Sequence, residues 1–364
     1  MNKMYSSIRI ALFVLCATFL STSSVFAIEV NPEDFGAVVN DGNDDSAAIQ
    51  AAVDRIFEAG GGTIFFPSGK LEVHRIIRLV PANYIGAEVK LKGNRGSVIE
   101  VSTGGSELAF YGGNLNTWTF EDLTFLGKKV PEGDPKFYDA GFVVYSNYVN
   151  QTNIIRCQFL GMAVRTDRAL IYVGRTDAKI VDSQFDGSLG QYPDGAVVLA
   201  AADSIGLTIS RSTFLDYANY GGVYLSKSPG YTGAWVRVKG GLPLNAIGQR
   251  RFVIEDSRFD EAAAAAIHIE NVTWAKIRGI SVNVNGASPG KGIYLKDVEH
   301  AMVEQSWFGY ATADRPAIVT ENVGVLEVNS LRLTGGVFFL DKRGDGEVDI
   351  KHCPQCTSVP AKKF

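Results

Sequence analysis

The sequence has few cysteines and histidines, no excess of positive charge and no hydrophobic run long enough to span a bilayer. Its formal net charge is -4, whereas a protein that binds nucleic acid needs a basic surface to neutralise phosphates. The main apolar run, residues 10–20, falls short of the roughly 20 residues of a membrane-spanning helix. We therefore expect neither a nucleic-acid partner nor a membrane anchor.

The first 27 residues have the features of an export signal. Lys3 and Arg9 precede the apolar run, and Val25-Phe26-Ala27 has the small-residue spacing of a signal-peptidase site. We predict a signal peptide over residues 1–27, and a mature protein that is secreted or periplasmic and monomeric.

The three cysteines beyond this segment predict no activity. Cys157 lies in a repeated phrase, and we expect it to be a buried small residue rather than a reactive thiol. Cys353 and Cys356, in HCPQC near the C-terminus, fit a small disulfide loop or half of a metal site, because an exported protein meets an oxidising compartment.

A short phrase recurs along the chain: NIIRCQFLG at residue 153, KIVDSQFDG at 179, LTISRSTFLD at 207 and FVIEDSRFDE at 252. Its alignment gives three columns of similar side chains. The first column holds Phe120, Ile154, Ile180, Ile209, Ile254, Ile277, Val303 and Val328; the second holds Leu123, Cys157, Ser183, Ser212, Ser257, Ile280, Ser306 and Leu331; the third holds Phe125, Phe159, Phe185, Phe214, Phe259, Val282, Phe308 and Leu333. Such columns are typical of a parallel β-solenoid, in which each coil buries its core against its neighbours.

A second phrase lies between these rows and has the alternating pattern of a short, half-buried strand. It occurs as LIYV at residue 170, AVVL at 196, GVYL at 222, AIHI at 266 and GIYL at 292. No helical segment separates the rows. We therefore predict one all-β solenoid domain over residues 28–340, followed by a cap or tail over residues 341–364.

The open N-terminal end of such a solenoid needs a cap. Asp44, Asp45 and Ser46 can start a helix that ends near Glu58, ahead of three glycines. Its apolar residues form one stripe and are Ile49, Val53, Ile56 and Phe57. We predict this helix over about residues 44–60, covering the first coil.

The entry segment, residues 34–73, contains DFGA, NDD, AAIQAAVD and GGGTIFFPSGK, and it resembles that of pectate-lyase-like right-handed β-helix proteins. The resemblance implies a right-handed parallel β-helix with an N-terminal capping helix. It implies no single activity, because the superfamily is similar across lyases, hydrolases, epimerases and non-catalytic tailspike or adhesin proteins. The paired Asp and His-Gly of polygalacturonase-type hydrolases are missing from the predicted coil edges, and the sequence lacks the Asp-Pro-His-Asp motif of alginate epimerases.

Basic and aromatic residues gather at the predicted strand edges instead: Lys136, Tyr138, Arg165, Arg168, Tyr192, Tyr217 and Tyr220. The outward row of the second strand is predicted to read Tyr172, Val198, Tyr224, His268 and Tyr294, and the outward sites two residues on include Ser226, Glu270 and Lys296. An insertion at residues 226–250, which carries Trp235 and Arg237, is expected to form a loop beside this row. Rings suit the apolar faces of sugars and cations suit carboxylates, so the row predicts a groove for an acidic polysaccharide. The alternative is that stacked rings only shield a sheet face.

The predicted groove residues fit β-elimination from a uronic acid. The substrate carboxylate must be neutralised before the adjacent C5 proton becomes acidic, and a base must lie within hydrogen-bond reach. His268 and Tyr224 are the predicted base and acid, in either order. The predicted carboxylate-binding residues are Arg165, Arg168 and Lys296, and the other predicted substrate contacts are Tyr217, Tyr220, Tyr294, Trp235 and Arg237. Asp194 with Asp139 remains open as the carboxylate pair of a hydrolase.

We therefore predict a secreted polysaccharide lyase acting on an acidic exopolysaccharide, similar to the enzymes with which Gram-negative bacteria trim biofilm matrix or capsule. A glycoside hydrolase on the same fold and a non-catalytic carbohydrate-binding matrix protein are the alternatives. The sequence requires no cofactor. Calcium stays open, because several aspartates lie at similar coil edges, although no ligand spacing demands the ion; they are Asp139, Asp167, Asp194 and Asp216.

Overall fold

The computed structural model describes residues 28–80, 86–102, 109–113, 116–127, 143–147, 149–161, 163–164, 169–186, 189–190, 195–215, 234–240, 251–260, 265–283, 291–311, 315–334 and 340–351. The predicted signal peptide and the segment from residue 352 onward lie outside these ranges. No helix within these ranges is long and apolar enough to cross a membrane.

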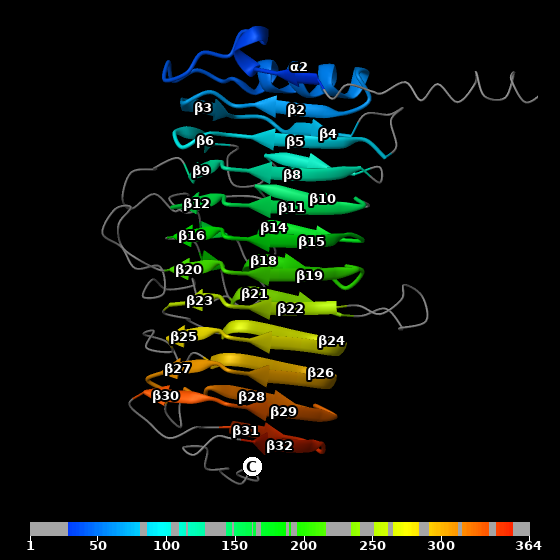
Figure 1. Ribbon diagram of the computed structural model, residues 1–364, viewed down its shortest axis with the longest axis vertical. Helices are drawn as coiled ribbons and strands as arrows, with labels where there is room; N and C mark the ends of the chain where they lie inside the picture. Colours follow the sequence, from blue (N-terminus) through cyan, green and yellow to red (C-terminus); the bar gives the residue numbers. More distant parts are fainter. Residues whose placement is uncertain are drawn as a thin grey trace, which may run out of the picture.

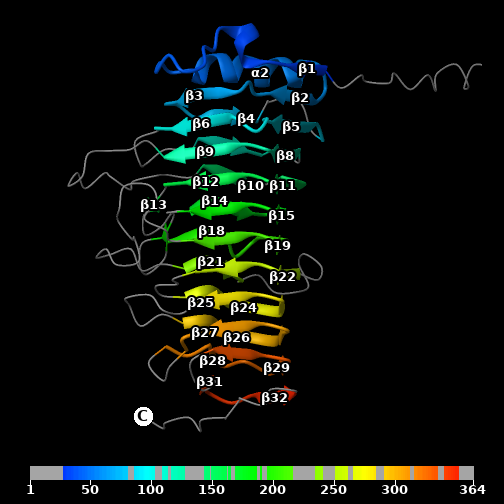
Figure 2. The same ribbon diagram turned by 60° about the vertical axis from the view of Figure 1, so that its left-hand side comes forward.

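The chain winds into a parallel β-helix whose coils lie one above another along the long axis of the molecule (Figure 1). A full coil contributes one strand to each of three stacks, named here stacks I, II and III, and neighbouring coils pair in parallel. The view in Figure 2 shows the same order of coils, from the helical cap to β32. The predicted fold is therefore confirmed.

Stack I consists of β4 (Ile77–Leu79), β7 (Phe110–Gly112), β10 (Val144–Asn147), β14 (Ala169–Gly174), β18 (Ala196–Ala200), β21 (Ala234–Lys239), the first halves of β24 (Ala265–Arg278) and β26 (Lys291–Glu304), β28 (Ile318–Glu321) and β31 (Leu340–Arg343).

Stack II consists of β1 (Ile28–Val30), β2 (Gly62–Phe65), β5 (Glu88–Lys92), β8 (Thr117–Glu121), β11 (Gln151–Ile155), β15 (Asp177–Val181), β19 (Gly206–Ser210), β22 (Arg251–Glu255), the second halves of β24 and β26, β29 (Val325–Asn329) and β32 (Glu347–Lys351).

Stack III is a 10-stranded sheet. It consists of β3 (Gly69–Val73), β6 (Ser97–Val101), β9 (Thr124–Gly127), β12 (Gln158–Leu160), β16 (Gln184–Asp186), β20 (Thr213–Leu215), β23 (Arg258–Phe259), β25 (Ser281–Asn283), β27 (Trp307–Gly309) and β30 (Arg332–Thr334).

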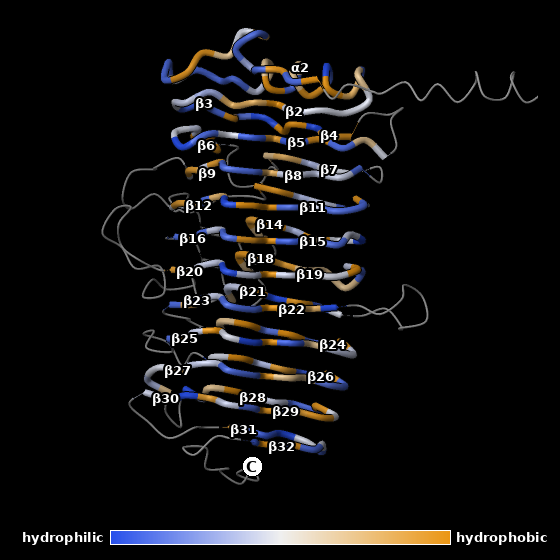
Figure 3. The backbone as a smooth tube through the Cα atoms, viewed as in Figure 1, coloured by the Kyte–Doolittle hydropathy of each residue, from blue (hydrophilic) through white to orange (hydrophobic). Residues whose placement is uncertain are grey.

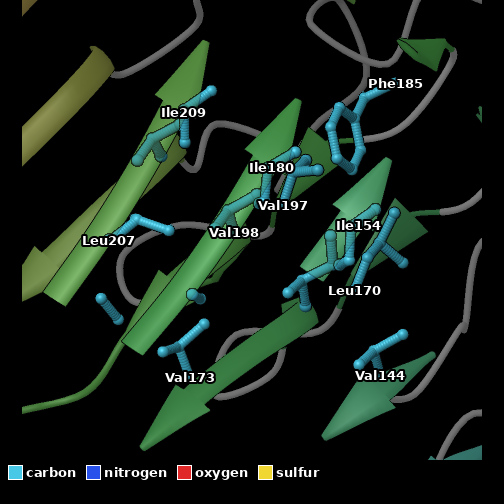
Figure 4. Packing of buried hydrophobic residues seen from close by; sticks show 14 of the residues in the cluster. Val144, Ile154, Leu170, Val173, Ile180, Phe185, Val197, Val198, Leu207 and Ile209 are labelled. Atoms are coloured by element: carbon cyan, nitrogen blue, oxygen red, sulfur yellow. The ribbon is translucent and has the colours of Figure 1, made fainter. Parts of the chain in front are cut away.

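The core consists of inward side chains that lie directly on their counterparts in the next coil. In stack II, Ile154 pairs in register with Phe120 on one side and Ile180 on the other, and Figure 4 shows Ile154, Ile180 and Ile209 in line. In stack III, the rings from Phe125 to Phe259 stack with centroids 4.6 to 4.9 Å apart. Both predicted columns are confirmed by the register, and Figure 3 shows hydrophobic residues recurring at the same place in successive coils.

The second predicted column lies at the corner between stacks II and III. Its serines are buried, and each hydroxyl accepts a hydrogen bond from the backbone of the preceding coil: the Ser183 N–H donates to Ser212 Oγ at 3.2 Å, and the Ser212 N–H donates to Ser257 Oγ at 3.1 Å. Cys157 occupies the same column as a buried free thiol, and its burial raises the thiol pKa to about 12. The prediction that Cys157 is structural is therefore confirmed.

The residue just before this column turns the chain through a left-handed backbone conformation. Arg156, Asp182, Arg211 and Asp256 have φ values of 51°, 52°, 47° and 49°. Arg156 Nε donates to Asp122 Oδ1 at 2.7 Å, and Arg211 Nε donates to Asp182 Oδ1 at 2.7 Å. Ion pairs between consecutive coils thus form at positions whose left-handed backbone conformation costs free energy in most residues.

The N-terminal end is covered by a short 3-10 helix, η1 (Pro32–Phe35), and by α2 (Ser46–Glu58). The buried Asp45 carboxylate accepts from the Val38 N–H at 3.0 Å and from the Glu72 N–H at 2.9 Å, and so joins the cap to β3. The apolar stripe of α2 is buried, as predicted.

The β-helix runs past the predicted boundary at residue 340. Residues 340–343 and 347–351 are β31 and β32, which pair with β28 and β29. The prediction of a cap from residue 341 was wrong for this segment, because EVDIK places Val348 and Ile350 in register with the core residues Leu326 and Val328.

Replacing Phe214 with alanine should lower the free energy of unfolding by about 3–5 kcal/mol, because it removes a buried ring that stacks on rings in both neighbouring coils. Urea unfolding measures the change, with Thr213→Ala on the same strand as the control. Equal losses for both variants would contradict the stacked core.

Replacing Ser212 with alanine should cost about 1–3 kcal/mol, because the Ser183 N–H would lose its acceptor in a buried corner. The matched control is Ser281→Ala, which removes a partly exposed hydroxyl from the outer face of β25. If urea unfolding gave the same stability for both variants, the corner serines would contribute no measurable hydrogen bond.

Candidate functional site

The outer face of stack I carries several of the residues that the sequence singled out, among them His268, Tyr294 and Lys296. Register places one outward row along it: Tyr111, Tyr145, Tyr172, Leu199, Arg237, His268, Tyr294, Val319 and Asp341. A parallel row, two residues on, holds Asn147, Gly174, Lys239, Glu270, Lys296, Glu321 and Arg343. The face is aromatic toward the N-terminal coils and charged toward the C-terminal coils.

The tyrosines of the N-terminal half pack against one another. The rings of Tyr145 and Tyr172 lie 4.4 Å apart with an interplanar angle of 2°, and those of Tyr111 and Tyr145 lie 5.4 Å apart at 19°. Burial raises the pKa of Tyr172 to about 12. Since the ring faces contact each other, this stretch favours the alternative that stacked rings shield the sheet face.

Arg237, His268 and Glu270 form a largely buried polar cluster on β21 and β24. Arg237 Nη2 lies 3.2 Å from Glu270 Oε1, and His268 Nε2 lies 3.5 Å from Glu270 Oε2. The contact with His268, helped by the Arg237 charge, lowers the pKa of Glu270 to about 2. Burial lowers the pKa of His268 below its ordinary value, although Glu270 opposes the shift. The cluster therefore holds an ionised carboxylate beside a neutral imidazole at neutral pH.

The next coil supplies Tyr294 and Lys291. The ring centroid of Tyr294 lies 4.7 Å from that of His268, and Lys291 Nζ lies 4.1 Å from the Tyr294 centroid. Burial raises the pKa of Tyr294, and its hydroxyl donates to Glu321 Oε2 at 2.7 Å. Burial likewise lowers the pKa of Lys291. Tyr294 is therefore a protonated phenol next to the neutral imidazole.

Two lysines of this face differ in whether a carboxylate pairs with their ammonium group. Lys296 Nζ lies 3.1 Å from Glu321 Oε1, and this ion pair takes up its charge. Lys291 has no carboxylate within ion-pair distance among the described residues, and its ammonium rests against the ring of Tyr294. Lys291 is thus better placed than Lys296 to receive the carboxylate of a ligand.

A small backbone layer covers one edge of this face. β13 (Ala163–Val164) and β17 (Leu189–Gly190) form a two-stranded parallel sheet that lies beside β18 and β21. The strand starts beneath this edge carry Ala196 and Ala234, which are 0% and 5% exposed.

The structure corrects the prediction for residues 226–250. Residues 234–239 are β21, which pairs with β18 and β24 and so occupies the place that the sequence analysis gave to GVYL at 222. AWVRVK and GVYL both alternate apolar and other residues, so the pattern alone did not separate them. Arg237 therefore lies in a strand, not a loop. Trp235 is 0% exposed and packs 6.0 Å from Phe214, so its prediction as a substrate contact was wrong.

The predicted outward row was also displaced by one residue at Val198. Val198 pairs with Ile171 and faces the core, while Leu199 pairs with Tyr172 and faces outward. A shift of one residue moves a side chain to the other face of a sheet. His268, Tyr294 and Lys296 lie on the outer face as predicted.

Several predicted residues lie outside the described part of the chain, and their roles stay predictions. They are Arg165, Arg168, Asp194, Tyr217, Tyr220, Tyr224, Cys353 and Cys356, together with the coil-edge aspartates Asp139, Asp167 and Asp216. Among the residues that are described, no group of three or more His, Cys, Asp or Glu side chains is arranged to hold a metal ion.

Three residues of this face were not predicted from the sequence, namely Lys291, Glu321 and Arg343, and Glu270 was predicted on it without a role. Glu321 and Arg343 share the register of Lys296, one and two coils further on, so extending that row toward the C-terminus would have found them. Lys291 lies at the first position of its strand, where the preceding coils have alanine, and this break in the small-residue column was the available signal.

Glu270 should make stability depend on pH at the acid end. Its pKa in the folded protein is about 2 against an ordinary 4.5, so its contribution is fully present above about pH 4.5 and is lost as the pH falls toward 2. Glu270→Gln should therefore reduce the acid dependence of the unfolding free energy in this interval. Urea unfolding at several pH values tests this, with the exposed Glu347→Gln as control; identical acid slopes in both variants would contradict the assignment.

Comparisons with known proteins find a similar fold in solved structures and a sequence match over one short segment. No family model matches the chain. Mannuronan C5-epimerase AlgE5 of Azotobacter vinelandii is 48% identical over 46 residues, 13% of this chain and 5% of that protein. Alginate lyase 7 of the same organism is 50% identical over 46 residues, with the same shares of 13% and 5%. The match thus spans about a twentieth of either relative.

Two solved structures resemble the whole described fold. The surface protein and adhesin PfbA of Streptococcus pneumoniae superposes with a TM-score of 0.62 at 14% identity, over 89% of this chain and 97% of that one. The A-module of mannuronan C-5 epimerase AlgE4 of Azotobacter vinelandii gives a TM-score of 0.51 at 15% identity, over 91% and 98%. At these identities the likeness shows a shared parallel β-helix fold.

Proposed function

We propose that this protein is a polysaccharide lyase that cleaves an acidic, uronic-acid-containing polysaccharide by β-elimination on the outer face of stack I. The observation that carries the proposal is the neutral, largely buried His268, which lies between the Arg237–Glu270 pair and the protonated Tyr294. Loss of the C5 proton of a uronate needs a base, a cation for the carboxylate and a proton donor. The face offers one of each.

His268 is the proposed base. Because its pKa is lowered, the imidazole is unprotonated at neutral pH and can accept the C5 proton. The Glu270 carboxylate, 3.5 Å from Nε2, stabilises the imidazolium that forms. Nε2 is itself buried beside this carboxylate, so Nδ1 is the ring nitrogen proposed to accept the C5 proton.

Lys291 is the proposed partner of the substrate carboxylate. Neutralising that group lets the negative charge left by the departing C5 proton spread onto the carboxylate oxygens. The ammonium is partly desolvated and lies against Tyr294, close enough to His268 to lower the pKa of the imidazole. Arg237, held by Glu270, adds a second positive charge behind the same site.

Tyr294 is the proposed acid. Its raised pKa keeps the proton on the phenol, and its hydroxyl can turn from Glu321 to the leaving oxygen. In the proposed reaction the C5–H and C4–O bonds break, a C4–C5 double bond forms, the C5 proton passes to His268, and the leaving sugar oxygen takes a proton from Tyr294. The predicted acid Tyr224 lies outside the described residues.

The local likeness to an alginate lyase and to C5-epimerases of mannuronan supports this chemistry. Elimination across C4–C5 and inversion at C5 both require removal of the C5 proton of a uronate. The carboxylates that contact His268 and Tyr294, Glu270 and Glu321, support hydrolysis less well. A glycoside hydrolase needs a carboxylic acid with a raised pKa, whereas the pKa values of Glu270 and Glu321 are both lowered, by His268 and Tyr294 respectively.

The test is incubation of the purified protein with alginate, polygalacturonate and polyglucuronate, followed by ultraviolet absorbance of unsaturated uronates. Absorbance that grows with time supports the lyase. New reducing ends without this absorbance would indicate a hydrolase instead. Binding without cleavage would indicate a carbohydrate-binding matrix protein. Export of the protein remains part of this proposal.

On the polymer that the protein cleaves in this test, His268→Ala and Tyr294→Phe should each lower turnover by about a hundredfold or more. The matched control is His300→Ala, since His300 pairs with Glu327 on the outer face of stack II. For the wild type, kcat/KM should fall as the pH drops through a midpoint below the ordinary 6.5 of histidine. Full activity of folded His268→Ala would move the site elsewhere.

A further inference from the structure

A second exposed aromatic site lies on the outer face of stack III, away from the charged cluster of stack I. Trp307 is the first residue of β27, with its side chain half-buried on the outside of the sheet. In register its neighbours are Ser281 in the preceding coil and Arg332 in the following coil. Tyr310, just past the strand, is 51% exposed.

The indole of Trp307 lies along the sheet instead of projecting from it. A Cβ at Gly309 would come within 2.5 Å of the outer edge of the six-membered ring, so the ring covers the place where Gly309 has no side chain. Trp307 Nε1 donates to Thr334 Oγ1 at 2.8 Å, across to the next coil. Gly309 and Thr334 together fix the indole as a flat platform over β27 and β30.

The surroundings of this platform are polar and carry positive charge. Arg332 is exposed and directly follows Trp307 in the outward row, and no ion pair to it is formed within the described ranges. Arg258, three coils before Arg332 in the same row, is by contrast paired with Asp260 at 2.6 Å. A flat ring suits the apolar face of a pyranose, and an adjacent unpaired guanidinium suits its carboxylate.

We propose that Trp307 and Arg332 form a second, non-catalytic binding site for a uronic-acid residue of a polysaccharide. The choice of an acidic polysaccharide as ligand rests on the proposed function, but the site needs no chemistry on stack I. A long polymer that contacts both faces of the β-helix gains effective concentration at each. The site should therefore raise the affinity for polymer without changing turnover of short oligosaccharides.

The experiment measures binding of alginate, polygalacturonate and polyglucuronate by affinity electrophoresis, with dextran as a neutral control. All proteins carry His268→Ala, so that the polymer is not degraded. Adding Trp307→Ala or Arg332→Gln should weaken binding of at least one polyuronate by about tenfold. In an otherwise wild-type chain, Trp307→Ala should leave turnover of short oligouronates unchanged.

Two matched controls separate the site from general effects. Trp274→Ala removes an outward indole from stack II, and Arg258→Gln removes the paired arginine of the same row; both should leave binding unchanged. Unaltered affinity in Trp307→Ala, loss of affinity for dextran as well, or no binding of any polyuronate would overturn the proposal. The proposal would also be overturned if Trp307→Ala or Arg332→Gln changed self-association in sedimentation but not the affinity for polymer. Trp307-dependent binding without elimination would uphold this site and reject only the lyase.

Discussion

The repeated contact between each coil and the next is the constraint on which the rest of the structure depends. Parallel pairing sets neighbouring strands about 4.8 Å apart, so an inward side chain must pack on the residue directly above and below it. The ring column from Phe125 to Phe259 and the aliphatic column through Ile154 satisfy this requirement. Because no coil can bury its core alone, every coil must keep its inward side chains in register with those of its neighbours.

The same register also determines the chemistry of the outer faces. Outward side chains are held at the coil spacing, so tyrosines on consecutive coils stack on each other and lose their free ring faces, as Tyr145 and Tyr172 do. Charged residues at the same spacing pair across coils, as Arg237 does with Glu270. The proposed binding residues lie where a row is interrupted: Lys291 breaks a column of alanines, and Trp307 lies over a glycine.

Burial and pairing act in opposite directions on the titrating groups of stack I. Desolvation favours the neutral forms of His268 and Lys291, while Glu270 and Glu321 stay ionised because basic or hydroxyl partners contact them. The result is a face that combines a neutral base with compensated carboxylates. Such a combination fits proton abstraction better than acid-catalysed hydrolysis.

The sequence by itself determined the solenoid and its three columns, because they follow from a pattern repeated in every coil, and the capping helix, because its apolar residues form one helical stripe. It also placed His268 and Tyr294 on one face, since strand alternation fixes sides. Only the tertiary structure decided which of two alternating segments, GVYL at 222 or β21, enters the stack, and therefore that Trp235 is core. The pairing of Arg237 with Glu270 and the hydrogen bond from Tyr294 to Glu321 depend on contacts between coils, which no local pattern encodes.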